Sequence, residues 1–424
     1  YDFQNANQLA QKTIELLNNP KLLKEMRLNA LHKISPTSWQ NSAIAHIDLV
    51  KNNSNKLKVE LQYEIPEISL NHIKRMTTED GLIQFSAIAT PNIQSGYTLD
   101  DNARALIAVT KHYQLTNDET DLELIDIYLK FILLCQQENG SFLNYVDKDG
   151  NFTPNNSNEN LEDANGRAIW ALGEFISLKE IIPNNLIRKA KFSIEKALIN
   201  IHKFRSPRAV SFAIKGLYFY NLDTQSPRIN YIITSLADNL VSKYRGISDK
   251  KWKWFEDYLT YANSILPEAM LFAGLSTGSE LYKNIAKTSF DFLLDLTFKE
   301  DQIKVISNQG WYHRGKVVNQ FGEQPIDVAY TILALQTFYQ VYEDENYKEK
   351  MKIAFDWFLG KNHLRQIVYN PKTGGCYDGL EENHINLNQG AESTISYLLS
   401  RLALEKVIKT VKEKEYHEEV FQNK

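Results

Sequence analysis

The chain contains only two cysteines in 424 residues, Cys135 and Cys376, and neither lies in a Cys-x-x-Cys motif. A disulfide framework of the kind that stabilises small secreted proteins is therefore not expected. The first residues, Tyr1-Asp-Phe-Gln-Asn, also lack the basic and then apolar stretch of a signal segment. Together these two absences predict a cytoplasmic protein.

The chain also lacks a strong charge of either sign and any long apolar run. Its net charge is −4, from 48 basic and 52 acidic residues, so neither nucleic acid nor an anionic membrane surface is expected as a partner. No uncharged apolar run reaches the roughly 18 residues that a transmembrane helix needs. We therefore expect no membrane span.

Several motifs that carry chemistry are missing as well. There is no phosphate-binding Gly-x-x-x-x-Gly-Lys-Ser/Thr loop, no Gly-x-Gly-x-x-Gly turn after a strand and no Gly-x-Ser-x-Gly elbow. The histidines are not spaced as metal ligands. The sequence thus gives no support for nucleotide hydrolysis, dinucleotide redox chemistry or serine hydrolysis, and it predicts no cofactor and no metal.

What the chain does have is an alternation of two helical patterns from about residue 66 onward. Helices of one kind are apolar on all sides and rich in Ala, Leu and Tyr, whereas the others carry charge on one face. The first kind is typical of a buried layer and the second of a layer that faces water. The expected inner helices are 100–109, 163–175, 207–220, 258–273, 327–339 and 392–404, and the expected outer helices are 68–76, 122–137, 185–201, 228–244, 280–297 and 347–359.

Six such pairs are the number that closes into an all-α (α/α)6 toroid, with the inner helices forming a barrel. An open helical solenoid would show the same alternation and is the alternative. We expect the toroid at 66–410, preceded by a helical segment at 1–52 and a polar linker at 53–65, and followed by a charged tail at 411–424. Short hairpins are expected at 140–152, 303–307 and 366–375, as additions to the rim.

Acidic residues recur at the starts of the expected inner helices. Capping of free backbone N–H groups explains one acid per helix, but not the doublets Asp100-Asp101, Glu162-Asp163 and Glu256-Asp257. In a closed toroid all these acids would lie on one rim, where crowding and burial raise some of their pKa values. Cleavage of a glycosidic bond needs two carboxyl groups with separated pKa values. The candidate catalytic residues are therefore Asp100, Asp101, Glu162, Asp163, Asp257, Asp327 and Glu392.

Two of these helix starts look like copies of each other. Asp100-Asp-Asn-Ala-Arg-Ala105 matches Asp163-Ala-Asn-Gly-Arg-Ala168 at four positions, with a shift of 63 residues. Each arginine follows its aspartate by four residues, so Arg104 and Arg167 are expected either to pair with those acids or to contact a ligand.

Other residues have the chemistry of a sugar-binding pocket. The loop Gly310-Trp-Tyr-His-Arg-Gly315 combines rings that stack on sugars with hydrogen-bond donors, although local packing would also account for it. A second polar set surrounds Glu392 in the sequence. The candidate binding residues are Tyr97, Arg104, Arg167, Trp254, Tyr258, Trp311, His313, Arg314, Asp378, His384, Asn388 and Gln389.

The N-terminal segment resembles a known family. Leu9-Ala-Gln-Lys-Thr-Ile-Glu-Leu-Leu-Asn-Asn-Pro20, Met26 and Ser38-Trp39 are similar to the C-terminal tail of retaining, nucleotide-sugar-dependent glycosyltransferases with two Rossmann lobes, the GT-B kind. In that family the tail folds back across both lobes. The donor-binding motif is absent from this chain, so the resemblance implies a glycosyltransferase catalytic domain as a partner rather than transferase activity here.

Residues 66–410 resemble the (α/α)6 toroids of carbohydrate-active enzymes, which include glycoside hydrolases, phosphorolytic relatives and sugar epimerases. Asp100-Asp101-Asn102 resembles the paired aspartates of toroidal endo-mannanases that cut α-linked chains. The epimerases of this fold rely on paired histidines near the pocket, and His313 and His384 are the only candidates here. The resemblance implies an oligosaccharide or polysaccharide as the ligand.

We therefore interpret the chain as a glycoside hydrolase. Carboxyls on opposite sides of a toroid favour a separation of about 6.5–9.5 Å, which predicts inversion, over the roughly 5–5.5 Å of retaining enzymes. The alternatives are a non-catalytic module that binds the acceptor glycan of a glycosyltransferase, a phosphorylase with Arg314 and Lys316 near the phosphate, and a purely structural helical scaffold.

Overall fold

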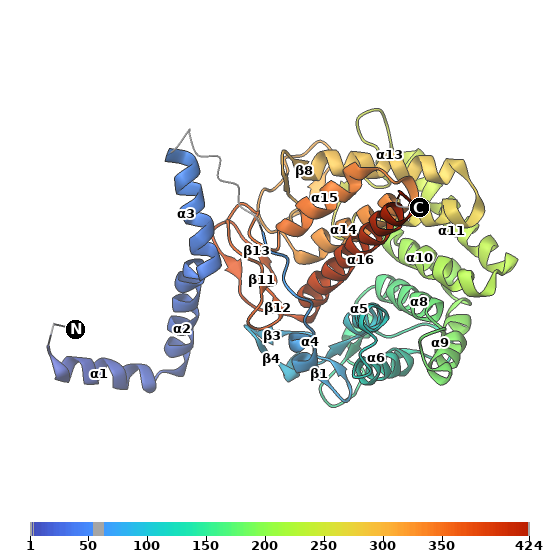
Figure 1. The fold of residues 1–424 in the computed structure, drawn as a ribbon. Coiled ribbons are helices and arrows are strands. Elements are labelled where there is room, and N and C mark those ends of the chain that lie inside the picture. The colour runs from blue at the N-terminus through green and yellow to red at the C-terminus, as the bar shows by residue number, and fades with distance from the viewer. Residues whose placement is uncertain (1, 3, 54–62, 423–424) are drawn as a thin grey trace.

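The computed structural model describes residues 2, 4–53 and 63–422, with only the backbone path described at residue 52 and at 411–422. Within this part of the chain, helices alternate between an inner and an outer ring, and the predicted all-α (α/α)6 toroid is confirmed (Figure 1). The inner ring consists of α5 (Leu99–Thr116), α8 (Glu162–Ser177), α10 (Pro207–Thr224), α12 (Ile265–Thr277), α14 (Pro325–Tyr342) and α16 (Ala391–Gln422). The outer ring consists of α4 (Asn71–Met76), α6 (Asp121–Cys135), α9 (Asn184–Ala197), α11 (Pro227–Ile247), α13 (Glu280–Thr297) and α15 (Glu345–Asp356).

The inner ring is closed. Each inner helix packs against the next one along the chain, and the last, α16, packs against the first, α5. An open solenoid would leave these two helices apart. Closure places the N-terminal ends of all six inner helices on one rim of the barrel, and this rim carries most of the predicted acids.

The closest helix pair in the barrel depends on glycine. A Cβ atom on Gly173 of α8 would lie 1.9 Å from the carbonyl oxygen of Gly216, and one on Gly216 of α10 would lie 2.3 Å from the carbonyl oxygen of Ile169. Side chains at either position would therefore force the two backbones apart. This close approach brings the polar residues of α8 and α10 together near the barrel axis.

The middle of the barrel is filled by three aromatic rings. Trp170 of α8, Phe212 of α10 and Tyr330 of α14 contact one another with ring centroids 5.7–5.9 Å apart. All three side chains are buried. The rings separate the rim that carries the helix N-termini from the opposite end of the barrel.

Short two-stranded hairpins decorate the toroid, as predicted for the segments that connect the helices. In the segment 140–152, Val146 bridges to Phe152, and β6 also pairs with β5. The hairpin predicted at 366–375 corresponds to β11–β12. The one predicted at 303–307 is misplaced, because the observed β8–β9 hairpin ends at Ile303. The paired strands are β1 (Thr77–Thr78) with β2 (Gly81–Leu82), β3 (Ser86–Ala87) with β4 (Thr90–Pro91), β5 (Tyr97–Thr98) with β6 (Tyr145–Val146), β7 (Tyr258–Leu259) with β10 (Tyr312–His313), β8 (Phe298–Lys299) with β9 (Gln302–Ile303), β11 (Tyr369–Asn370) with β12 (Gly375–Cys376), and β13 (Gly379–Leu380) with β14 (Ile385–Asn386).

The predicted start of the fourth inner helix at residue 258 is wrong. Residues 258–259 form β7, and α12 begins only at Ile265. The side chain of Asn263 accepts a hydrogen bond from the backbone N–H of Thr260 and donates one to its carbonyl oxygen, which fixes a turn ahead of the helix. Pro267 then occupies the first turn of α12, where its missing N–H costs nothing. Glu256 and Asp257 consequently precede a strand and not a helix.

The predicted helical segment at 1–52 consists of α1 (Ala6–Leu17), α2 (Pro20–Ile34), a 3-10 turn at Ser35–Thr37 and α3 (Trp39–Asn53). These helices lie beside the toroid and not within it (Figure 1). The hydrogen-bonded contact is made by α3, where Asn41 accepts from the backbone N–H of Ile367 at 2.9 Å and Asp48 pairs with Arg365, while His32 of α2 packs on His384.

The flanking regions differ in part from the predicted boundaries. Most of the predicted linker at 53–65 lies outside the described residues. The predicted tail at 411–424 does not begin as a separate segment, because α16 continues to Gln422. Among the described helices, none combines the length and apolar character needed to cross a bilayer. Both cysteines are buried and free.

Candidate functional site

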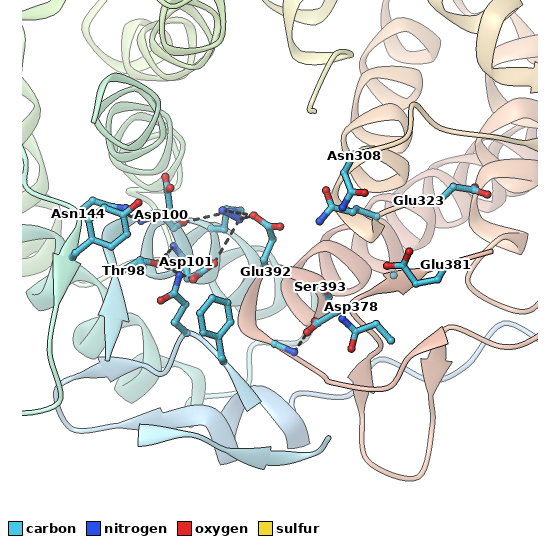
Figure 2. Close-up of a pocket in the computed structure, with 18 residues that line it drawn as sticks. Thr98, Asp100, Asp101, Asn144, Asn308, Glu323, Asp378, Glu381, Glu392 and Ser393 are labelled. Atoms are coloured by element: carbon cyan, nitrogen blue, oxygen red, sulfur yellow. Dashed lines mark hydrogen bonds and ion pairs between the residues drawn. The ribbon is translucent and has the colours of Figure 1, made fainter. Parts of the chain in front are cut away.

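A cavity of about 380 Å³ opens at the N-terminal rim of the barrel, between the starts of α5 and α16 and the loops beside them. Figure 2 shows Asp100, Asp101 and Glu392 on one side of this space and Asn308, Glu323 and Glu381 across from them. We call it the rim cavity. Its labelled lining residues are Thr98, Asp100, Asp101, Asn144, Asn308, Glu323, Asp378, Glu381, Glu392 and Ser393.

Arg104 connects the carboxylates on the α5–α16 side of the rim cavity. Both terminal nitrogens of its guanidinium lie 3.0 Å from Glu392 Oε2, and one lies 3.6 Å from Asp101 Oδ1. The arginine side chain is only 3% exposed, so these carboxylates, and not water, are the partners of its charge. The expected pairing of Arg104 with the Asp100 carboxylate is wrong, since only the backbone oxygen of Asp100 accepts from Arg104 Nε, at 3.4 Å.

Arg167 departs from the predicted pairing in the same way. It reaches from α8 to α5, where Nη1 lies 2.6 Å from Asp100 Oδ1. The carboxylate expected as its partner, Asp163, instead accepts hydrogen bonds from Ser206 Oγ at 2.6 Å and from the hydroxyl of Tyr261. In both repeats the arginine points to an acid of the neighbouring inner helix, Arg104 to Glu392 of α16 and Arg167 to Asp100 of α5. The ion pairs therefore join helices around the ring.

Burial and charge separate the acids of the rim cavity. Burial raises the pKa of Asp101 to about 6, against the opposing effects of Arg104 and of the hydrogen bond from Thr98 Oγ1 at 2.7 Å. The side chains of Asp100 and Glu392 are 24% and 41% exposed, and each forms an ion pair with an arginine. The α5–α16 side of the cavity thus has two partly exposed carboxylates beside a buried acid whose pKa is raised toward neutral pH.

Asp378 lies on the other side of Glu392. Its Oδ1 accepts a hydrogen bond from the backbone N–H of Gly390 at 2.9 Å, just before α16 begins. Burial raises the pKa of Asp378, while the Gly390 hydrogen bond opposes that rise. The contact holds the start of α16, and hence Glu392, against the β13–β14 hairpin.

Four of the seven predicted acids do not line the rim cavity: Asp163, whose partners are given above, and Glu162, Asp257 and Asp327. Glu162 accepts hydrogen bonds from the backbone N–H groups of Arg205 and Ser206 at 2.6 and 2.7 Å, so it caps the start of α10. Asp257 is exposed and pairs with Arg314. Asp327 is buried, and its Oδ1 accepts the backbone N–H of Ala262 at 2.6 Å.

Asp327 nevertheless has a strongly raised pKa. Burial raises its pKa to about 8, and the charge of Glu392 adds to the effect. Its Oδ2 is buried and accepts no hydrogen bond from the described residues. The protonated carboxyl is therefore favoured at this point of the barrel.

Most of the predicted aromatic ligands belong to the packing of the toroid. The hydroxyl of Tyr97 bonds to Thr78 at 2.9 Å and its ring packs on Phe131, while Trp254 is fully buried. Neither lines the rim cavity. Trp311, half-buried and with φ of +55°, packs against the hydrophobic core. The sequence pattern could not separate these rings from ligand-facing ones.

The loop at 310–315 forms β10 and pairs with β7, which brings His313 beside Tyr258 with ring centroids 5.7 Å apart. Arg314 is bound to Asp249 and Asp257. None of these residues is part of the rim cavity. His384 also lies outside the lining, edge-on to His32 at 5.1 Å.

Asn388 and Gln389 shape the loop that precedes α16. Asn388 Oδ1 accepts the backbone N–H of Ile88 at 2.9 Å. Gln389 is 1% exposed; its carbonyl oxygen lies 2.8 Å from His72 Nε2 and its Oε1 accepts from Thr373. Both residues support the rim cavity without lining it.

The sequence interpretation missed lining residues that lie on loops. Gln84, Phe85, Asn144, Tyr145 and Asn308 come from segments between helices. Of these, only Asn144 and Tyr145 carried a signal, because they fall in a predicted hairpin.

No protein-family model and no curated protein sequence matches the chain. Solved structures do. Cellobiose 2-epimerase from Bacillus thermoamylovorans aligns with a TM-score of 0.62 and 12% identity, over 80% of this chain and 96% of that one. A D-mannose isomerase aligns with a TM-score of 0.56 and 15% identity, over 78% and 93%.

An α-1,6-mannanase from a Salegentibacter species aligns with a TM-score of 0.53 and 13% identity, over 79% of this chain and 96% of that one. That structure is an inactive variant in which two adjacent aspartates are replaced, in complex with α-1,6-mannotetrose. These neighbours share the (α/α)6 toroid with the chain, and at this level of identity the likeness establishes the fold.

Proposed function

We propose that the chain hydrolyses glycosidic bonds of an oligosaccharide or polysaccharide in the rim cavity. The observation that carries this proposal is the meeting of Asp100, Asp101 and Glu392 around two buried arginines. Glycoside hydrolysis needs carboxyl groups in different protonation states, and these three differ in burial and in ionic partners. The inactive mannanase lost two adjacent aspartates, which supports a role for the Asp100-Asp101 doublet.

In this proposal Asp101 supplies the proton to the leaving oxygen. Its pKa of about 6 keeps part of the population protonated near neutral pH. Asp100 and Glu392, as carboxylates paired with Arg167 and Arg104, are the candidates for the base that activates water. The premise that these carboxyls lie on opposite sides of the toroid is wrong, because Arg104 binds both Asp101 and Glu392. Inversion remains our proposed stereochemical outcome for this pair.

An epimerase or isomerase is the second candidate, because two of the structural neighbours catalyse such reactions. The cavity lining favours hydrolysis. No histidine lines the described rim cavity, and His313 and His384 both lie elsewhere. Carboxyl groups are the titratable side chains that line it most densely.

The remaining alternatives have less support. A phosphorylase would need a cation for phosphate in the rim cavity. Arg314 is occupied by two aspartates, and neither Arg314 nor Lys316 lines the rim cavity. A module that only binds an acceptor glycan would not require an acid with a raised pKa beside two carboxylates.

We also propose that the helices at 1–52 pack against a glycosyltransferase lobe, with the whole assembly in the cytoplasm. The support is the exposed apolar surface of these helices. Ile14 is 56% exposed, Leu17 66% and Trp39 87%. Such rings and aliphatic chains on helices beside a folded toroid are typical of a surface that a further domain covers.

The reaction class is tested by incubating the purified chain with manno- and gluco-oligosaccharides, with and without inorganic phosphate, and separating the products. The proposal predicts shorter sugars whose release does not depend on phosphate. Strict phosphate dependence would identify a phosphorylase, and an isomeric product of unchanged length an epimerase. Binding without any product would identify a glycan-binding module.

A further inference from the structure

A second cavity of about 650 Å³ opens at the opposite end of the barrel from the rim cavity. All six inner helices contribute to its wall. We call it the lower cavity. The buried rings of Trp170, Phe212 and Tyr330 lie between the two cavities, so the lower cavity is not an extension of the proposed glycosidase site. Its volume is within the range of small-molecule pockets.

Each of the two acids in the wall of the lower cavity forms an ion pair with a lysine. Glu268 accepts hydrogen bonds from Lys215 Nζ at 2.8 Å on both oxygens and from Thr337 Oγ1 at 2.8 Å. Glu174 accepts from Trp170 Nε1 at 2.7 Å and pairs with Lys111. Both carboxylates are buried and already hydrogen-bonded, so little of their acceptor capacity is open to the hydroxyls of a sugar. A second glycan is therefore a poor fit.

The cations of the lower cavity outnumber its acids. Lys406 of α16 lies in the wall and, within the part of the chain whose side chains are described, forms no ion pair. A smaller cavity of about 220 Å³ next to it shares Lys111 and Lys406 and adds Lys409. Lys111 pairs with Glu174, whereas Lys406 and Lys409 form no ion pair with the described side chains, so the α5–α16 side of the opening is cationic.

The opposite side of the lower cavity is apolar apart from Lys215 and Glu268, which are buried and form an ion pair with each other. Tyr218, Phe219 and Leu222 of α10 face it together with Phe272 and Leu275 of α12. Leu222 is 56% exposed and Leu275 37% exposed, so this apolar surface is open at the mouth. In the closed ring, α10 and α12 lie across from α5 and α16. One ligand placed in this space would meet rings and aliphatic chains at one end and ammonium groups at the other.

We propose that the lower cavity binds a small organic anion with an apolar body, such as an aryl carboxylate, with its charge at Lys406 and Lys111 and its body against Phe219 and Leu222. An apolar body removes these exposed side chains from water, and the carboxylate supplies the ionic partner that Lys406 lacks. The cationic and apolar sides of the cavity therefore favour this class of ligand.

The test is isothermal titration of the full chain with 2-naphthoate and with its neutral analogue 2-naphthamide. The proposal predicts saturable binding of one naphthoate per chain and binding of the amide that is weaker by about tenfold or more. Lys406→Gln is expected to weaken naphthoate by about tenfold and to leave the amide unchanged. Leu222→Ser is expected to weaken both ligands.

The matched control is Lys189→Gln, which removes an exposed lysine of α9 on the outer ring and should leave both affinities unchanged. Both Lys406 and Leu222 are exposed, so their substitution is expected to leave the fold intact. Absence of saturable naphthoate binding would overturn the proposal. So would equal affinities for naphthoate and naphthamide that Lys406→Gln does not alter, because that result describes nonspecific apolar partitioning.

Discussion

Arg104 and Glu392 lie 288 positions apart in the chain and form an ion pair at 3.0 Å between the first and the last inner helix. The pair therefore closes the barrel and also sets one wall of the rim cavity. Arg104 also contacts Asp101, the buried acid that we propose as the proton donor. The same guanidinium therefore closes the ring and contacts the proposed proton donor.

Removing this guanidinium should affect both stability and the site. Arg104→Gln leaves Asp101 buried without its cation, and we expect the free energy of unfolding to fall by about 2 kcal/mol or more at pH 7. Urea denaturation measures the change. Arg228→Gln, which removes an exposed arginine paired with Glu195 on the surface, is the control and should change the stability by less than about 1 kcal/mol. Equal effects of the two substitutions would contradict the role assigned to Arg104.

The raised pKa of Asp101 predicts a pH limit for activity. If Asp101 must be protonated to act, kcat/KM should fall as pH rises through about 6, since the carboxyl then loses its proton. A pH–rate profile on a cleaved oligosaccharide measures this. A rate that stays constant from pH 5 to 8 would exclude Asp101 as the proton donor.

Asp327 predicts a pH dependence of stability. Its pKa is raised from 3.8 to about 8 in the folded chain, so between these values the folded state binds a proton that the unfolded state has released. Stability from this group is present below about pH 4 and is lost as pH rises toward 8. The parent should therefore lose stability between pH 5 and pH 8, by a few kcal/mol at most.

The amide of Asp327→Asn does not titrate in this range, so the stability of this variant should fall less between pH 5 and pH 8. Denaturation at several pH values compares the two proteins, with Asp257→Asn as the control for an exposed aspartate. If the parent and Asp327→Asn respond to pH in the same way, the raised pKa of Asp327 is wrong.

The glycine contact between α8 and α10 predicts opposite effects of two alanine substitutions. Gly216→Ala would place Cβ 2.3 Å from a backbone oxygen, and we expect a loss of about 1–3 kcal/mol or more. A Cβ atom added to Gly246 of α11 would meet no other atom within 4 Å, so Gly246→Ala should stabilise by about 0.5–1 kcal/mol through helix propensity. Thermal melting of both variants is the measurement. A harmless Gly216→Ala would show that the helices can separate without cost.

The stereochemistry of the reaction is open to a direct test. We expect the first sugar released to have the inverted anomeric configuration if Asp101 of α5 donates the proton and Glu392 of α16 activates the water. Proton NMR of the products within minutes of mixing distinguishes the anomers before they equilibrate. A retained configuration would contradict direct attack by an activated water and would indicate a covalent glycosyl-enzyme intermediate.

The fold was readable from the sequence because the inner helices are apolar on all sides and the outer ones on one face. Six such pairs were enough to predict the toroid. The start of α12 was mispredicted, since the apolar residues near Tyr258 and Leu259 suit a strand as well as a helix. Only the tertiary pairing of β7 with β10 decides between them.

The site was predictable only in part. Asp100, Asp101 and Glu392 were identified because helix starts share one rim in a closed ring. The partners of Arg104 and Arg167 were not, because spacing along one helix says nothing about the acid of the next helix. Buried rings such as Trp254 have the same local sequence character as ligand-facing ones, so their position could not be inferred.

The most direct test of the proposed function compares Asp100→Asn with Asp257→Asn on an oligosaccharide that the parent cleaves. Both changes replace a carboxylate with an amide, but Asp100 lines the rim cavity and Asp257 lies at the surface against Arg314. The account predicts that Asp100→Asn lowers kcat/KM by about 100-fold or more, while Asp257→Asn keeps the parent rate. Full activity of Asp100→Asn would contradict a catalytic role for the carboxylates that meet at Arg104 and Arg167.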